Sequence, residues 1–234
     1  SNILITARDI INLWVARMIF SGLEFMGKSP FPEVLIHATI LTKEGQRMSK
    51  SKGTGIDPLE LIEKYGADAT RFGIIWQAMG TQDIRWDETA VQAGKKFANK
   101  LWNVARYVMQ KVSPSTNNES LTNQRIRTFE KNSLFVDKAD RDIIEKLEKL
   151  KKEIEQDIEN YEFGPALHKA YDFVWHEFAD KYIELSKKRE DENAKMVLGR
   201  VLADSLKLLH PFMPFITEEI YQRMELGALI VAEW

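Results

Sequence analysis

The chain has 234 residues, of which 44% are hydrophobic and 29% charged, so it can bury the core of one large domain or two small ones. It contains no cysteine, which excludes disulfide bonds and cysteine-ligated zinc and is typical of a reducing cytosol. Its apolar runs are too short to span a bilayer and it shows no secretory signal, so we expect a cytoplasmic protein.

The formal net charge of −2 hides an uneven distribution. Residues 1–112 carry 15 Lys and Arg against 11 Asp and Glu, whereas residues 113–234 carry 18 against 24. Any contact with a phosphate backbone must therefore depend on local basic patches.

The first part of the chain combines a helical pattern with a strand pattern. Apolar residues at helical spacing over residues 8–26 predict a helix with a broad buried face, and Gly27 is a typical end for it. The apolar run of residues 34–41 predicts a buried strand. A helix followed by a strand is typical of an α/β domain.

Helical patterns dominate the rest of the sequence. Asp57 and Pro58 mark the start of a short helix that Gly66 ends. Residues 113–132, rich in Ser, Thr and Asn, predict an exposed connection. We therefore predict a mainly α chain in which an antiparallel helical bundle follows a small α/β portion. The other helices are expected at residues 67–79, 88–112, 138–161, 165–189, 192–210 and 215–226.

A polar loop over residues 42–55 carries the most distinctive chemistry. It holds two cations, Arg47 and Lys50, and the hydroxyl groups of Ser49 and Ser51. Lysine supplies a compact charge, hydroxyls donate hydrogen bonds, and the loop's glycines allow close backbone approach, as a polyphosphate requires. Such a lysine stabilises the charge that develops during transfer at a phosphate. By charge alone, however, an ordinary solvated surface is the better interpretation of this loop, because basic loops are usually solvated.

The order of residues in this loop resembles a known signature. Residues 47–51 read Arg-Met-Ser-Lys-Ser, similar to the Lys-Met-Ser-Lys-Ser motif of class I aminoacyl-tRNA synthetases. The continuation over residues 52–59 and 65–72 resembles the subgroup that handles valine, isoleucine and leucine. Three further stretches resemble the family: residues 9–19, 82–86 and 210–221. The first two are similar to the valine branch, and the third is similar to a motif that the whole subgroup shares.

This resemblance implies the organisation of the chain and its activity. Residues 1–87 correspond to the C-terminal part of a Rossmann-type catalytic domain with the phosphate loop and stem-contact region. Residues 88–234 correspond to a helical anticodon-binding domain. The implied enzyme activates valine with ATP, accompanied by Mg²⁺, and transfers it to its tRNA. We expect a monomer without a protein metal site.

The family's functional residues in the loop map onto residues 47–51. Lys50 is implied to contact the ATP phosphates and stabilise the transition state, with Arg47 assisting. Met48, Ser49 and Ser51 are implied to complete the nucleotide-binding loop. Arginine in the first place keeps the charge of lysine but not its geometry.

Two further nucleotide-binding residues follow from the resemblance alone. Asp9 is implied to lie near the ribose of the adenylate and His37 near its adenine. Ala7 and Ala38 stand where the family has glycine. For His37, a strand-end histidine bonded to backbone is an equally good interpretation.

The family's second signature, His-x-Gly-His, does not occur around any of the chain's four histidines. We therefore expect the chain by itself to be unable to form valyl-adenylate. Basic residues on the helix after the loop are candidates for contact with tRNA phosphates: Lys95, Lys96, Lys100 and Arg106.

Two alternative interpretations remain. One is the same region of an isoleucyl or leucyl enzyme, which residues 82–86 disfavour. The other is a non-catalytic RNA-binding module derived from such an enzyme, which has no use for a transition-state lysine at position 50.

Overall fold

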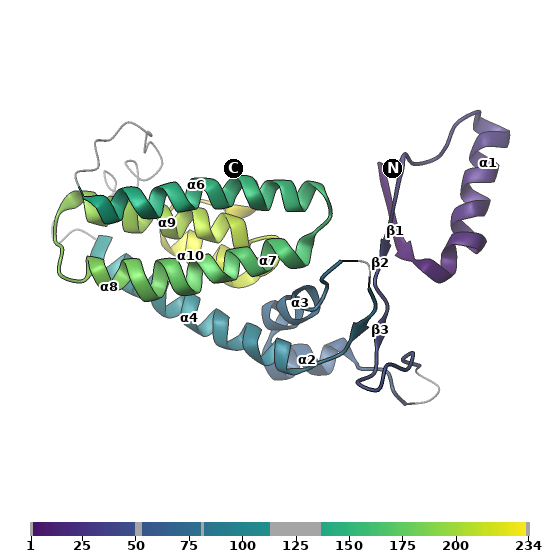
Figure 1. Cartoon of the computed structure of the whole chain (residues 1–234), viewed down its shortest axis with the longest axis horizontal. Helices are drawn as coiled ribbons and strands as arrows, with labels where there is room; N and C mark the ends of the chain where they lie inside the picture. The colour runs from purple at the N-terminus through teal and green to yellow at the C-terminus, as the bar shows by residue number, and fades with distance from the viewer. Residues whose placement is uncertain (1, 50–52, 81, 113–136, 233–234) are drawn as a thin grey trace. The chain divides into compact units, whose positions relative to one another are not determined.

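The computed structural model is mainly helical and divides into two compact units (Figure 1). The first unit comprises residues 1–56 and 78–87, and the second comprises residues 57–77 and 88–234. The predicted connection over residues 113–132 lies outside the described residues. No described helix is long and apolar enough to cross a membrane. The structure describes residues 2–49, 53–80, 82–112 and 137–232.

The first unit is built on two short pairs of parallel strands. β1 (Ile3–Ala7) pairs with β2 (Glu33–His37), so that Ala7 lies opposite His37. β3 (Ile40–Leu41) pairs in the same sense with β4 (Ile84–Arg85). The strand predicted over residues 34–41 is therefore confirmed as a strand, with a break after His37.

One helical stretch connects β1 to β2. It begins as a 3₁₀ turn (Arg8–Ile10), continues as a π-helical segment (Ile11–Val15) and becomes α1 (Ala16–Met26). It ends as predicted at Gly27, whose φ of 67° is left-handed and whose N–H donates to the carbonyl of Leu23 at 3.2 Å.

The burial predicted for this helix and strand is wrong. Val15 is buried, but Trp14 and Phe25 are 64% and 81% exposed, and β2 contains no buried residue. Within the described residues of this unit, pairs of short strands offer too little surface to cover the apolar side of a helix.

The helices of the second unit pack around one apolar core, and their predicted periodicity is confirmed (Figure 1). Phe97, Leu101 and Val108 are fully buried at helical spacing on α4, as are Leu147 and Ile154 on α6. The elements are α2 (Pro58–Tyr65), α3 (Ala67–Trp76), α4 (Thr89–Val112), α6 (Lys138–Glu159), α7 (Phe163–Asp172) continuing through a π-helical segment (Phe173–Tyr182) into α8 (Ile183–Ser186), α9 (Glu192–Leu209), α10 (Pro214–Arg223) and a 3₁₀ turn (Leu229–Val231).

A buried ion pair ties α6 to the segment that follows α8. Asp140 is fully buried and accepts hydrogen bonds from the two Nη atoms of Arg189, at 2.7 and 2.9 Å. It also accepts from the hydroxyl of Tyr182 at 2.7 Å. Burial, and then this hydrogen bond, raises the pKa of Tyr182 well above its usual value, so the hydroxyl remains a donor. Arg189 donates in addition to Asp191, the N-cap of α9.

Removing the buried carboxylate should destabilise the second unit. Asp140→Ala leaves Arg189 and Tyr182 without their shared acceptor, and we expect it to lower the free energy of unfolding by about 3 kcal/mol. Urea titration followed by circular dichroism measures this. Asp142→Ala, an exposed carboxylate on the same helix, is the control and should change stability by less than about 0.5 kcal/mol. Equal effects of the two substitutions would contradict a structural role for the buried pair.

Candidate functional site

The carboxyl ends of β1 and β2 lie side by side in the first unit. Because the strands are parallel and Ala7 is opposite His37, the residues that follow each strand leave the sheet at the same edge. Arg8 and Asp9 follow β1, and Ala38 and Thr39 follow β2. This edge is where open α/β sheets bind their ligands.

Asp83 joins these strand ends to the segment before β4. Its Oδ1 accepts a hydrogen bond from the backbone N–H of Thr39 at 3.0 Å and forms an ion pair with Arg8. The next residue, Ile84, donates its N–H to the carbonyl of Thr39 at 2.9 Å. The sequence placed Asp83 only within residues 82–86, a stretch that resembles the valine branch, and did not predict that this residue joins the strand ends. The available signal was a carboxylate directly before the short strand β4, which begins with a buried isoleucine.

The basic loop leaves β3 through a tight turn that positions Arg47. The N–H of Thr42 donates to the carbonyl of Gln46 at 2.8 Å, and Leu41 and Arg47 form an antiparallel bridge. The guanidinium of Arg47 then forms an ion pair with Asp9, although both side chains remain substantially exposed. The structure therefore brings together two of the predicted site residues, one from the loop and one from the end of β1.

The far part of the loop is closed by Ser49 and Thr54. The N–H of Ser49 donates to Oγ1 of Thr54 at 3.0 Å, and the N–H of Thr54 donates to the carbonyl of Ser49 at 3.2 Å. The side chain of Thr54 thus supplies the acceptor at the base of the loop. The predicted residues Lys50 and Ser51 lie between these two positions and outside the described residues.

His37 and Met48 complete the described part of the predicted site. His37 is exposed at the end of β2, and its Nδ1 lies 2.9 Å from the carbonyl oxygen of Ala38. Met48 is partly buried within the loop. Within the described ranges, no three His, Asp or Glu residues gather as they would around a metal ion.

A second candidate surface lies on α4, which carries five cations and no carboxylate. Five of its polar residues share one exposed face at helical spacing, over about 21 Å of helix. We call this face the α4 stripe, and it consists of Lys96, Asn99, Asn103, Arg106 and Gln110.

The four cations predicted to contact RNA fall into two groups. Lys100 donates to Asp180 at 2.7 Å and lies 3.9 Å from the ring centroid of Trp175, and its hydrogen bond lowers the pKa of Asp180. Lys95 donates to the carbonyl of Lys64 at 3.1 Å. Lys96 and Arg106, by contrast, have no partner among the described residues, so they are the cations free to meet a phosphate.

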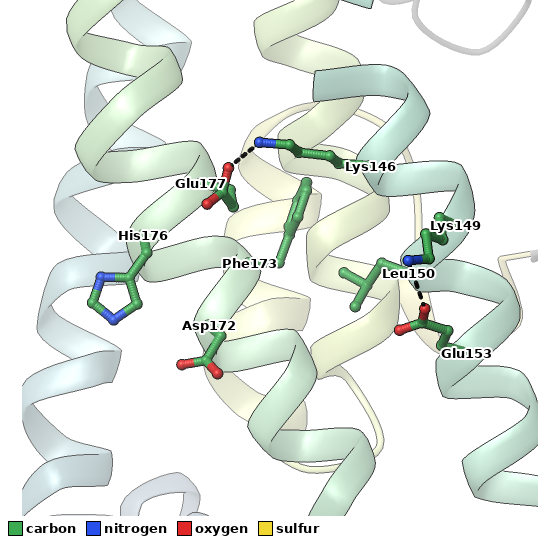
Figure 2. A pocket seen from close by; sticks show the side chains of 8 residues that line it. All are labelled: Lys146, Lys149, Leu150, Glu153, Asp172, Phe173, His176 and Glu177. Carbon is green, nitrogen blue, oxygen red and sulfur yellow. Dashed lines mark hydrogen bonds and ion pairs between the residues drawn. The ribbon is translucent and has the colours of Figure 1, made fainter. Parts of the chain in front are cut away.

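An open groove lies between α6 and the helix that runs from α7 into the π-helical segment (Figure 2). Its floor is formed by Leu150 and Phe173, while Lys146 pairs with Glu177 across it. Lys149 pairs with Glu153 on α6 itself, at 3.5 Å. Because these cations are already matched by carboxylates, the groove lacks the free positive charge of a phosphate site.

Two family models match most of the chain. The model for class I tRNA synthetases (I, L, M and V) matches residues 1–87, and the model for the anticodon-binding domain of tRNA ligases matches residues 140–234. The chain belongs to the class I aminoacyl-tRNA synthetase family.

Curated relatives narrow this family to one branch, because they are valine–tRNA ligases. The enzyme of Clostridium tetani (strain Massachusetts / E88) is 47% identical over 228 residues, which cover 94% of this chain and 25% of the relative. That of Carboxydothermus hydrogenoformans is 42% identical over 242 residues, covering 100% of this chain and 26% of the relative. The chain thus spans about a quarter of the length of the relatives it matches.

Solved class I synthetases share the fold. A LeuRS of Agrobacterium radiobacter K84, in a ternary complex with tRNA and LeuAMS, has a TM-score of 0.75 at 21% identity, covering 100% of this chain and 28% of that chain. Methionyl-tRNA synthetase of Mycobacterium tuberculosis, bound by methionyl-adenylate, has a TM-score of 0.65 at 18% identity, and the match covers 94% of this chain and 43% of that chain. At these identities the likeness establishes the fold alone.

The joining role of Asp83 predicts a local effect on the first unit. Asp83→Ala removes the acceptor for the Thr39 N–H and the partner of Arg8. We expect hydrogen exchange at the Thr39 amide to accelerate about fivefold, which corresponds to about 1 kcal/mol for one hydrogen bond. Glu24→Ala on α1 is the control, because that carboxylate is exposed and remote from the strand ends in sequence. Unchanged exchange at Thr39 would refute the role given to Asp83.

Proposed function

We propose that the chain is part of a valine–tRNA ligase, which activates valine with ATP and transfers it to the valine tRNA. The observation that carries this proposal is the ion pair between Arg47 and Asp9, which brings the basic loop to the carboxyl ends of parallel strands. A polyphosphate bound there would meet the loop's cations, while its nucleoside would lie along the strand ends. The identity to valine–tRNA ligases supports valine as the amino acid.

We further propose that residues 1–87 form the C-terminal part of a Rossmann-type catalytic domain with the phosphate loop and the stem-contact region. The parallel pair of β1 and β2, connected through a helix, is the βαβ unit from which such domains are built. Residues 88–234 are proposed as an antiparallel helical anticodon-binding domain. We propose a monomeric, cytoplasmic enzyme.

Each nucleotide contact in this proposal has a physical basis. Lys50 stabilises charge on the ATP phosphates, and Arg47 supports it from the base of the loop. Ser49 and Ser51 donate hydrogen bonds, and Met48 packs the loop. Their flanking glycines allow the backbone to approach the phosphates.

The strand ends are proposed to hold the nucleoside. Asp9 accepts from the ribose hydroxyls, and His37 lies beside adenine. Mg²⁺ is proposed to arrive with ATP and to be held by its phosphates, because the carboxylates of Asp9 and Asp83 are already paired with Arg47 and Arg8.

The α4 stripe is the proposed contact with the tRNA backbone. Its two free cations supply salt-dependent attraction to phosphates, and its amides donate hydrogen bonds without introducing like charge. The absence of any carboxylate along α4 removes the repulsion that the acidic remainder of the second unit would otherwise impose.

Direct binding of the chain to tRNA tests the proposed function. We expect fluorescence anisotropy with valine, isoleucine and leucine tRNA transcripts, at several salt concentrations, to reveal a preference for valine tRNA that persists as salt rises. Equal binding to all three, disappearing at high salt, would contradict specific recognition by this chain.

Neutralising the stripe tests the RNA-binding surface separately. Lys96→Gln with Arg106→Gln should weaken binding to valine tRNA and lower the slope of log affinity against log salt by about two, since each cation neutralises one phosphate. Lys152→Gln is the matched control for the loss of one charge, because it is exposed on the acidic helix α6. A slope that stays constant would remove the stripe from the interface.

A further inference from the structure

The buried carboxylate of Asp68 caps a helix that lies far from it in the sequence. It is on α3 and only 9% exposed, and its two oxygens accept from the N–H groups of Phe215 and Ile216 at 3.1 and 2.7 Å. These amides lie in the first turn of α10, where backbone N–H groups lack partners within the helix. The side chain at the N-cap position, Met213, makes no capping hydrogen bond to them. Asp68 therefore supplies the cap that α10 lacks.

One turn further along α3, Arg71 binds the other side of the same corner. Its Nε donates to the carbonyl of Phe212 at 3.2 Å, and its Nη2 donates to the carbonyl of Pro211 at 2.8 Å. These carbonyls directly follow the end of α9. Negative charge is thus placed at the start of α10 and positive charge just beyond the end of α9, which is the arrangement that helix dipoles favour. Asp68 and Arg71 together therefore bind both segments that meet at the α9–α10 corner.

The opposite side of α3 is in close contact with α4. A Cβ atom on Gly73 would lie 2.5 Å from Cγ2 of Val91, and one on Gly94 would lie 3.0 Å from the carbonyl oxygen of Ala69. Side chains at either position would force the two helices apart, so their backbones are as close as glycine permits. Any shift of α3 must therefore move α4 with it.

We propose that Asp68 and Arg71 are positioning residues for the α4 stripe. By fixing α3 to the α9–α10 corner, they set the orientation in which α4 presents Lys96 and Arg106. Asp68 is itself too buried to touch RNA, so its influence passes through the backbone of α3. This inference rests on the proposed function of the stripe and assigns to two residues of α3 a role that they perform at a distance from the ligand.

Two substitutions release the corner without changing the stripe. Asp68→Asn removes the charge and leaves only one acceptor for two amides. Arg71→Gln changes an exposed side chain and leaves the core intact, so it tests the proposal even where Asp68→Asn folds poorly. Glu63→Gln, an exposed carboxylate on α2, is the matched control. Binding to valine tRNA is measured by anisotropy at a temperature where circular dichroism finds every variant folded, and hydrogen exchange is measured in parallel at Phe215 and Ile216.

We expect both corner variants to lose affinity for RNA by roughly fivefold, the equivalent of one helix cap, because fewer molecules hold α4 in the binding orientation. Their salt slope should equal that of the unsubstituted chain, since no phosphate contact is removed. Exchange at Phe215 and Ile216 should accelerate, and Glu63→Gln should change none of these quantities. A purely stabilising role predicts unchanged affinity in a fully folded variant.

The outcomes separate this inference from the proposed function. If the Lys96 and Arg106 substitutions reduce affinity while folded Asp68→Asn and Arg71→Gln do not, positioning through α3 is overturned and the RNA surface stands. If the Lys96 and Arg106 substitutions leave both affinity and salt slope unchanged, the RNA surface fails and the positioning role fails with it. A corner variant that loses affinity together with salt slope would mean direct RNA contact, which also overturns the inference.

Discussion

Buried helix ends are the constraint on which the second unit depends, because every backbone N–H and C=O removed from water needs a partner. The local sequence supplies some of them, as when Asp191 accepts from the N–H of Ala194 at the start of α9. Others come from distant segments. Asp68 caps α10, and Glu218 accepts from the amides of Leu229 and Ile230 in the terminal turn. Although burial acts to raise the pKa of Glu218, hydrogen bonds from Gln222 and these amides lower it, so the carboxylate stays charged as a cap requires. Carboxylates thus connect helices that hydrophobic packing alone would leave free to slide.

The first unit uses charge differently. Its ion pairs, between Arg8 and Asp83 and between Arg47 and Asp9, are largely exposed, and exposed pairs contribute little to stability. Their value lies in geometry, because each connects a strand end to a segment that arrives from elsewhere in the chain. The pair between Arg47 and Asp9 also keeps the loop's arginine beside the strand ends while most of its surface remains open to a ligand. Weak, exposed contacts of this kind suit the proposed loop function, in which Arg47 exchanges Asp9 for a ligand.

Local pattern was sufficient to predict the helices, because apolar spacing and caps such as Asp57 and Gly27 act within a few residues. The same reasoning misjudged the burial of Trp14 and missed Asp83, since exposure and pairing depend on residues distant in sequence. Lys100 shows the limit most clearly. Its charge and its place on the helix after the loop predicted an RNA contact, yet its ammonium group already donates to Asp180 and lies over the ring of Trp175. Residues 210–221, which were quoted for the family resemblance, bury Phe212 and Thr217, and His210 is bonded to Thr217. A motif in a sequence identifies a family, but only contacts distinguish residues that bind from residues that hold the fold.

Under the proposed function, the placement of charge explains how a chain of net charge −2 would orient RNA. α6 carries eight carboxylates against six cations, whereas α4 carries five cations and no carboxylate. The electrostatic field of the second unit is therefore uneven, with positive charge along α4 and negative charge along α6. A uniformly basic surface attracts any polyanion in any orientation and gains affinity without selectivity. A polarised surface repels RNA from most approaches and attracts it along one, which favours productive encounters over accumulation. That advantage exists only if the attractive helix is held in a fixed direction. In the proposed complex, the orientation of α4 is therefore as much a part of recognition as the charges it carries, and the residues that fix α3 contribute to binding without contacting RNA.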